Sequence, residues 1–452
     1  MVGKTEKTPQ LDIFKTPLKQ FINLNHELCV LANKINWEKE TEKFSGYYKN
    51  FGRPSVPLRR MIGLVLLKYM YNLSDEQIVE RWIENPYWQY FTGEIYFQVE
   101  KPIDPSEFVH FRKRIGDSGA EELLKLSINL FGKEAKEKEV LIDTTVQEKN
   151  ITFPTDTKLH KKIIDKCNVM AKREEIQLRQ SYKRVLKQLM IDQRFRTHPK
   201  RKKKANAAAR KIKTIAGRIV RDIERKMDDF QLGYYGRTLE IFKQILEQER
   251  DTKNKIYSIH EPHVKCIAKG KEHKPYEFGN KSSFVKTRKS GIIIGAIAFT
   301  ENLYDGDTLE PQLEQVERVA GYCPKVAIVD RGFRGKKHVF DTLIFTPKPL
   351  PQTATRYQEQ LTRKRFKSRA GIEPVIGHIK YDHRMIRNYL RGEMGDKVNT
   401  ILAATAFNLR KMLLKIKKEV KNIFFNFIER FFQEFLLAKP NLEICIVKKW
   451  TF

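Results

Sequence analysis

Two aspartates that follow short apolar runs could hold metal ions for chemistry on phosphate groups. Asp143 follows the run 139–142 and Asp330 follows the run 325–329. Strand ends in an α/β sheet open on a common crevice, so both carboxylates are expected at one site. Mg²⁺ prefers carboxylate oxygen, and two ions ~4 Å apart activate the attacking oxygen and stabilise the leaving one in phosphoryl transfer. An aspartate after a strand is also often a turn residue or a helix cap, so neither position is decisive alone.

The residues after Asp330 favour the chemical interpretation. The segment 330–335 reads Asp-Arg-Gly-Phe-Arg-Gly. Its two arginines, Arg331 and Arg334, carry guanidinium groups suited to phosphate. Its two glycines free the backbone to approach a ligand closely. We therefore expect Asp330 to bind metal, with both arginines as candidates for DNA-backbone contacts.

A third carboxylate is predicted at Glu373. Arg369, Glu373 and Lys380 lie at i, i+4 and i+11, which places them on one face of a helix over about three turns. An acid between two cations suggests that Glu373 binds metal while Arg369 and Lys380 bind DNA phosphates. Pro374 would lie inside that helix and kink it, which conflicts with a straight helix.

Other side chains compete for roles in this site. Asp307, in the glycine-containing segment 304–309, is an alternative second carboxylate, although that segment resembles a turn and a supporting role stays open. Four histidines could also bind metal, although a lone histidine is more often a hydrogen-bonded structural residue. They are His260, His263, His273 and His378.

The elements that precede the first aspartate read as helices. Apolar residues follow a helical period over 57–71, a capping box opens at Ser74, and Pro86 ends the helix that follows it. The two short helices joined by 72–73 resemble a helix-turn-helix, and an ordinary helical bundle explains them equally well.

From residue 140 onward the pattern changes to short apolar runs separated by helical segments, which predicts an α/β sheet. The expected strands are 139–145, 255–259, 264–268, 291–299, 325–330 and 341–346. Between the first and second lies a helical insertion, about 158–250. Its second half places an apolar face at helical spacing, formed by Ile212, Ile215, Ile219, Val220, Ile223 and Met227. The basic run 198–204 is either solvated surface or a DNA-tracking arm.

The composition indicates a folded, basic protein. Its 452 residues suffice for two or three domains, and 87 Lys and Arg against 55 Asp and Glu leave a net charge of +32. Nucleic acid is the usual polyanionic partner of such a surface. Scattered cysteines without zinc-ligand spacing predict buried thiols in a reducing compartment. No apolar run approaches the ~20 residues of a membrane span, so we expect no membrane association and a soluble, cytoplasmic protein.

Three motifs in order resemble the DDE transposases of bacterial insertion sequences, in the broad insertion-sequence-four and insertion-sequence-five assemblage. The first is the run 141–151 around Asp143, and the second is 329–335 around Asp330. The third resembles the family signature Tyr-x2-Arg-x3-Glu-x6-Lys and is matched by Phe366, Arg369, Glu373 and Lys380. Phe366 replaces the usual tyrosine, so that hydroxyl is absent. The resemblance covers about 50–415.

The resemblance implies an architecture and an activity. It implies an α/β RNase H-like catalytic core at 136–415 with the helical insertion, preceded by an all-α domain at 1–135 and followed by a helical tail at 416–452. It implies two Mg²⁺ or Mn²⁺ ions held by Asp143, Asp330 and Glu373. It also implies double-stranded DNA as substrate, recognition of terminal inverted repeats, a homodimer on DNA, and residence in the bacterial cytoplasm or nucleoid.

Two other functions compete with this one. A decayed transposase could act as a non-catalytic DNA-binding repressor, and a metal nuclease could share the same acids without joining DNA ends. The presence of all three acids argues against decay, and strand transfer separates a transposase from a nuclease. The 1–135 region, with a possible DNA-binding or dimerisation role, does not distinguish them.

Overall fold

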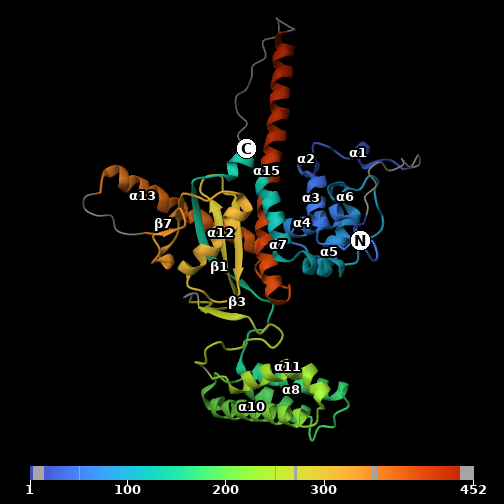
Figure 1. Cartoon of the computed structure of the whole chain (residues 1–452), viewed down its shortest axis with the longest axis vertical. Helices are drawn as coiled ribbons and strands as arrows, with labels where there is room; N and C mark the ends of the chain where they lie inside the picture. Colours follow the sequence, from blue (N-terminus) through green and yellow to red (C-terminus); the bar gives the residue numbers. More distant parts are fainter. Residues whose placement is uncertain (4–14, 50, 250, 269–271, 348–353, 438–452) are drawn as a thin grey trace.

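The computed structural model describes residues 1–3, 15–49, 51–249, 251–268, 272–347 and 354–437. It contains one mixed sheet flanked by helices, an N-terminal group of helices beside it, and a second helical group at the far end of the sheet (Figure 1). Among the described helices, none has a stretch long and apolar enough to cross a membrane.

The sheet is built around β1, and its strand order is β2-β3-β1-β5-β7-β6 with β4 also paired to β3. Strand β1 pairs antiparallel with β3 and parallel with β5. Strand β7 continues the parallel side and β4 the antiparallel side. The bounds are β1 Glu139–Glu148, β2 Lys265–Ala268, β3 Tyr276–Thr287, β4 Ile293–Phe299, β5 Val326–Ile328, β6 His338–Val339 and β7 Thr342–Phe345.

The predicted α/β sheet is present, with two corrections. The longest strand, β3, was missed, because its sequence YEFGNKSSFVKT mixes polar and apolar residues without a clean alternation. Residues 255–259 are not a strand. Their apolar side chains, Ile256 and Ile259, are buried in the core of the insertion. The backbone of Ile256 bonds to the side chain of Gln248 at 3.0 and 3.2 Å, so no strand partner is needed.

The N-terminal region is helical, as predicted, and shares one hydrophobic core with the sheet. Its elements are α1 Leu18–Phe21, α2 Glu27–Lys34, α3 Trp37–Ser45, α4 Leu58–Met70, α5 Asp75–Glu84, α6 Pro86–Thr92 and α7 Glu107–Asn129. Helix α4 is buried along nearly its whole length, and the capping box at Ser74 opens α5. The exposed side of α5 presents Glu76, Glu80 and Glu84. This acidic face would repel DNA phosphates.

A single long helix, α15 (Gly392–Leu437), connects the N-terminal helices to the sheet. It packs against α7, α4 and β4, and α12 (Leu309–Ala320) covers β4 beside it. Figure 1 shows α15 running between the sheet and the N-terminal helices. The helix passes residue 416 without a break, and residues 438–452 of the predicted tail lie outside the described residues.

The insertion is a helical group with a core of its own. It consists of α8 Asp156–Arg173, α9 Lys183–Gln193, α10 Lys202–Glu224 and α11 Asp229–Glu247. The apolar face predicted from Ile212 to Met227 is buried, because α8, α9 and α11 all pack on α10. Cys167 lies in this core, and burial raises the pKa of its thiol to about 12. Figure 1 shows the group at the lower end of the molecule.

A buried ionic cluster fixes the root of the insertion to the core. The ammonium of Lys149, just after β1, lies 2.6 Å from Asp396 Oδ1 and 3.4 Å from Glu261 Oε2. The Nε2 atom of His263 lies 2.9 Å from Asp396 Oδ2. Because these residues come from both connections of the insertion and from α15, the cluster ties three segments together. His263 is thereby placed in a structural role.

Candidate active site

The helix predicted around Glu373 is interrupted, which resolves the conflict over Pro374. Helix α13 (Arg356–Arg369) ends before a 3-10 turn, η5 (Ala370–Ile372), and α14 (Glu373–Asp382) begins at the glutamate. Pro374 therefore lies in the first turn of α14, where its missing N–H leaves no hydrogen bond unmade. The expectation of one continuous helix carrying Arg369, Glu373 and Lys380 was wrong.

Side chains from the sheet hold this interruption in place. The ammonium of Lys286, on β3, donates to the carbonyl of Gly371 in η5 at 2.9 Å. Burial lowers the pKa of Lys286, and the charge of Lys411 lowers it further. Arg288 donates to the hydroxyl of Ser368 at 3.0 Å, at the end of α13. The turn between Arg369 and Glu373 is therefore anchored to the sheet rather than left in solvent.

Helix α13 is pinned to the first strand through Glu139. Arg365 donates through Nε to Glu139 Oε1 at 3.0 Å, and Arg288 also bonds this carboxylate. Partial burial raises the pKa of Glu139, but the bonds and charges of Arg365 and Arg288 outweigh burial and lower it. Phe366, which replaces the family tyrosine, stacks on Phe345 of β7 with ring centroids 5.1 Å apart. At this position the aromatic ring therefore packs α13 against β7.

Arg369 brings two of the predicted acids together. Its Nη2 lies 3.6 Å from Asp330 Oδ2, and its Nη1 lies 3.7 Å from Glu373 Oε1. The Glu373 side chain is 63% exposed and that of Asp330 is 35% exposed, so both carboxylates are open to solvent. The Nε of Arg369 is buried and has no hydrogen-bond partner among the described residues. Arg369, predicted to bind DNA, here bridges the acids.

Asp143 lies on the strand next to Asp330. The parallel pairing of β1 and β5 matches Leu141 with Ile328, and each aspartate follows two residues later, Asp143 within β1 and Asp330 beyond the end of β5. The prediction that Asp143 ends its strand was wrong, because β1 continues to Glu148 along β3. It is β5 that stops at this level. Asp143 Oδ1 accepts a hydrogen bond from the Thr144 amide at 2.8 Å.

A fourth carboxylate, Asp305, lies at this place and was missed from the sequence. Thr144, next to Asp143, donates its hydroxyl to Asp305 Oδ1 at 3.0 Å, and Lys281 donates to the same oxygen at 2.9 Å. A Cβ added to Gly332 would come within 2.9 Å of both Asp305 Oδ2 and Asp330 Oδ1. Asp305 therefore lies close to Asp330 and is bonded to the residue that follows Asp143. Asp307, the alternative second carboxylate, is exposed in the same turn.

The other predicted cations lie on or beside the elements that carry Asp330 and Glu373. Asp330 caps the turn η4 (Arg331–Phe333) by accepting from the Gly332 amide at 2.7 Å. Arg331 and Arg334 are exposed beside it. Lys380 lies two turns beyond Glu373 on α14 and is partly buried.

The donor set suits a hard divalent cation, since carboxylate oxygen is its preferred ligand. Asp143 lies on β1, Asp330 follows β5 and Glu373 begins α14, and a side chain at Gly332 would crowd the carboxylates of Asp305 and Asp330. In the described part of the chain, however, no three acidic, histidine or cysteine side chains converge closely enough to hold an ion. Arg369 occupies the space between Asp330 and Glu373. The residues fit the metal chemically, with Arg369 as the competing cation.

Comparison with known proteins places this arrangement in a family. Residues 16–114 match the model of a transposase domain (DUF772), and residues 333–413 match a transposase DDE domain. An uncharacterized protein, ORF8 in the nfe locus of Rhizobium meliloti, is 43% identical over 192 residues, which are 41% of this chain and 93% of that protein. The chain belongs to the DDE transposases of bacterial insertion sequences. No solved structure matches it.

The two matched segments cover different parts of the chain. The first spans most of the N-terminal helices, and the second begins just after Asp330 and includes Arg369, Glu373 and Lys380. Asp143, Asp305 and the insertion fall between the two matches. The chain is therefore a DNA transposase whose partner is DNA, and the roles of its individual site residues are addressed below.

Proposed function

We propose that this transposase cleaves DNA at the ends of an insertion sequence and joins those ends to target DNA by two-metal phosphoryl transfer. The catalytic core would be RNase H-like and span 136–415, with 1–135 and 416–452 as flanking helical parts. Support comes from the mixed sheet, in which the strand of Asp143 lies between antiparallel β3 and parallel β5, the strand that leads to Asp330. The observation that carries the proposal is twofold: the parallel register of β1 and β5 puts Asp143 and Asp330 at the same level, and Arg369 lies within 3.7 Å of both Asp330 and Glu373.

Each residue of the site has a role in this proposal. Asp143, Asp330 and Glu373 would hold Mg²⁺ or Mn²⁺, which activates the attacking oxygen and neutralises charge on the transferred phosphate. Arg369 would keep Asp330 and Glu373 oriented. Lys380, Arg331 and Arg334 would contact the DNA backbone near the site. In-line displacement depends on positioning and charge neutralisation, so no covalent protein nucleophile is required.

The proposal is tested with a labelled duplex that carries the terminal inverted repeat of the element. We expect the full chain to nick the repeat end in Mg²⁺ and to join the freed 3′-hydroxyl to a target plasmid. Joined products separate a transposase from a nuclease that only hydrolyses DNA. DNA binding without nicking in either Mg²⁺ or Mn²⁺ would overturn the proposal in favour of a repressor.

Asp305 provides a prediction about positioning within the same site. We expect Asp305→Ala to lower the cleavage rate at saturating DNA by about 10- to 100-fold, because small displacements of reacting groups cost rates of this order. The variant loses the acceptor that Thr144 and Lys281 share. Asp307→Ala, two residues on in the same turn, is the matched control and should change the rate less than about twofold. Equal losses in both variants would remove Asp305 from the site.

A further inference from the structure

The insertion carries a disproportionate share of the positive charge. Residues 156–247 contain 26 Lys and Arg against 11 Asp and Glu, a net charge of +15 out of +32 for the whole chain. About a fifth of the sequence therefore carries nearly half of the net positive charge. Like charges at this density repel one another in the folded protein, and a bound polyanion relieves that repulsion.

Three arginines of α10 and Arg225, which directly follows the helix, form a stripe on its exposed side. Arg210, Arg218, Arg221 and Arg225 are separated by eight, three and four residues, which keeps them on one face at 3.6 residues per turn. The opposite face, from Ile212 to Ile223, is buried in the core of the insertion. This arginine stripe extends over about 22 Å of the helix axis at ~1.5 Å per residue.

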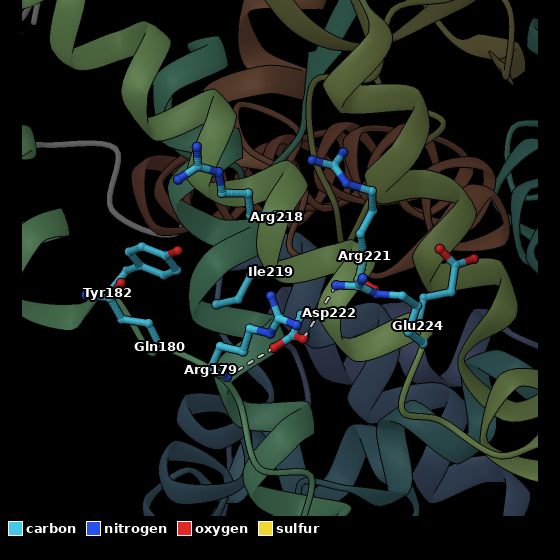
Figure 2. Close-up of a pocket in the computed structure, with 9 residues that line it drawn as sticks. Arg179, Gln180, Tyr182, Arg218, Ile219, Arg221, Asp222 and Glu224 are labelled. Atoms are coloured by element: carbon cyan, nitrogen blue, oxygen red, sulfur yellow. Dashed lines mark hydrogen bonds and ion pairs between the residues drawn. The ribbon is translucent and has the colours of Figure 1, made fainter.

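The surface around the arginine stripe leaves the guanidinium groups accessible. Thr214 and Gly217 lie between the arginines and carry little or no side chain. A groove of about 500 Å³ runs on one side, lined by Arg218 and Arg221 together with Tyr182. A second groove, of about 820 Å³, lies on the other side toward α11. Figure 2 shows Arg218 and Arg221 extending from α10 in the same direction, away from Asp222.

The nearby carboxylates are already engaged by other groups. Asp222 accepts from the Arg179 amide at 3.1 Å and from Lys226 at 3.3 Å, and it lies 3.7 Å from Arg225. Glu224 is paired with Lys243. Within the described residues no ion pair is found for Arg210, Arg218 or Arg221. In the described part of the chain, three of the four guanidinium groups thus have no carboxylate partner.

We propose that the arginine stripe binds the sugar–phosphate backbone of duplex DNA, at a surface separate from the carboxylate site. The inference rests on the proposed function, because DNA is then the polyanion that the chain handles. A straight row of guanidinium groups over about 22 Å matches a regular line of phosphates. Figure 1 places α10 beyond the end of the sheet, away from α13. One chain would thereby hold DNA at two places.

The test compares two triple variants by titrating a labelled duplex of arbitrary sequence without divalent metal. One variant is Arg210→Gln, Arg218→Gln and Arg221→Gln. The control is Lys166→Gln, Lys172→Gln and Arg237→Gln, which removes the same charge from exposed residues of α8 and α11 that line neither groove. Circular dichroism melting checks that both remain folded.

For each protein, the logarithm of the DNA association constant is plotted against the logarithm of the salt concentration. We expect the magnitude of this slope to be smaller by about 2.7 in the stripe variant, since each of its three lost phosphate contacts removes about 0.9. Its affinity at about 0.1 M salt should fall by ten- to several-hundredfold. The control should lower the slope by less than about 1. Equal changes in the two variants would mean that the stripe contributes only net charge, and would overturn the proposal.

The same proteins separate this proposal from the proposed function. If the wild type cleaves and joins DNA but the two slopes change equally, the stripe proposal alone fails. If the slopes differ as expected but no protein cleaves, the DNA surface is supported and the catalytic proposal fails. A stripe variant that binds weakly but cleaves at the wild-type rate under saturating DNA supports a binding role apart from the acids.

Discussion

Asp330→Asn is expected to abolish Mg²⁺-dependent cleavage and joining while leaving DNA binding intact. Asparagine preserves the shape of the side chain and can still accept the Gly332 amide that Asp330 caps at 2.7 Å. What it removes is one negative charge facing Arg369 and the proposed ions. A metal ligand contributes several kcal/mol to the transition state, so a loss of about 4 kcal/mol lowers the rate about 10³-fold.

The measurement is the single-turnover cleavage rate at saturating duplex, with affinity determined separately without metal. Asp341→Asn is the matched control, because Asp341 is an exposed aspartate of the same domain, just before β7. We expect it to behave as the wild type. If Asp330→Asn cleaved at the wild-type rate, Asp330 would not be a ligand, and Asp305 would become the next candidate beside Asp143.

Local periodicity explains why some of the site could be predicted. The i, i+4 spacing of Arg369 and Glu373 predicted that they share a face, and their side chains lie 3.7 Å apart although the helix breaks between them. The contact survives because the intervening turn keeps nearly helical backbone angles, with φ −60° and ψ −47° at Glu373. The apolar face of α10 was predicted for the same reason: a 3.6-residue period is legible in any short window.

Long-range pairing explains what could not be predicted. Asp305 and Asp307 lie in the same turn, and nothing local distinguishes them. Asp305 is selected by Thr144, which is 161 residues away in the chain. Strand β3 was missed similarly, because both of its edges are paired and polar residues such as Ser282 and Ser283 are buried within it. A buried central strand need not alternate, so its pattern resembles a loop.

Asp75→Ala is expected to destabilise the N-terminal helices by about 3–5 kcal/mol, the usual cost of stranding a buried charge. Asp75 Oδ1 lies 2.6 Å from the Lys68 ammonium, and Asp75 Oδ2 lies 2.7 Å from Arg112 Nη2. The two cationic side chains are only 3% and 8% exposed. Removing the carboxylate of Asp75 would take this ion-pair partner away from both buried cations. Urea unfolding followed by the fluorescence of Trp37, Trp82 and Trp88 measures the loss, and exposed Glu80→Ala is the control.

The pH dependence gives this prediction a second, independent readout. Burial raises the pKa of Asp75, but the bonds and charges of Arg112 and Lys68 outweigh it and lower the pKa to about 2. The stabilisation from Asp75 is therefore present above about pH 4 and is lost as the pH falls toward 2. In Asp75→Ala, the fall in the free energy of unfolding that Asp75 causes between about pH 4 and pH 2 should be absent. Adding Lys68→Met should recover part of the neutral-pH stability, because burial already lowers the pKa of Lys68 and an apolar side chain needs no partner. If the double variant were no more stable than Asp75→Ala, the unpaired Lys68 would not be the cause of the lost stability.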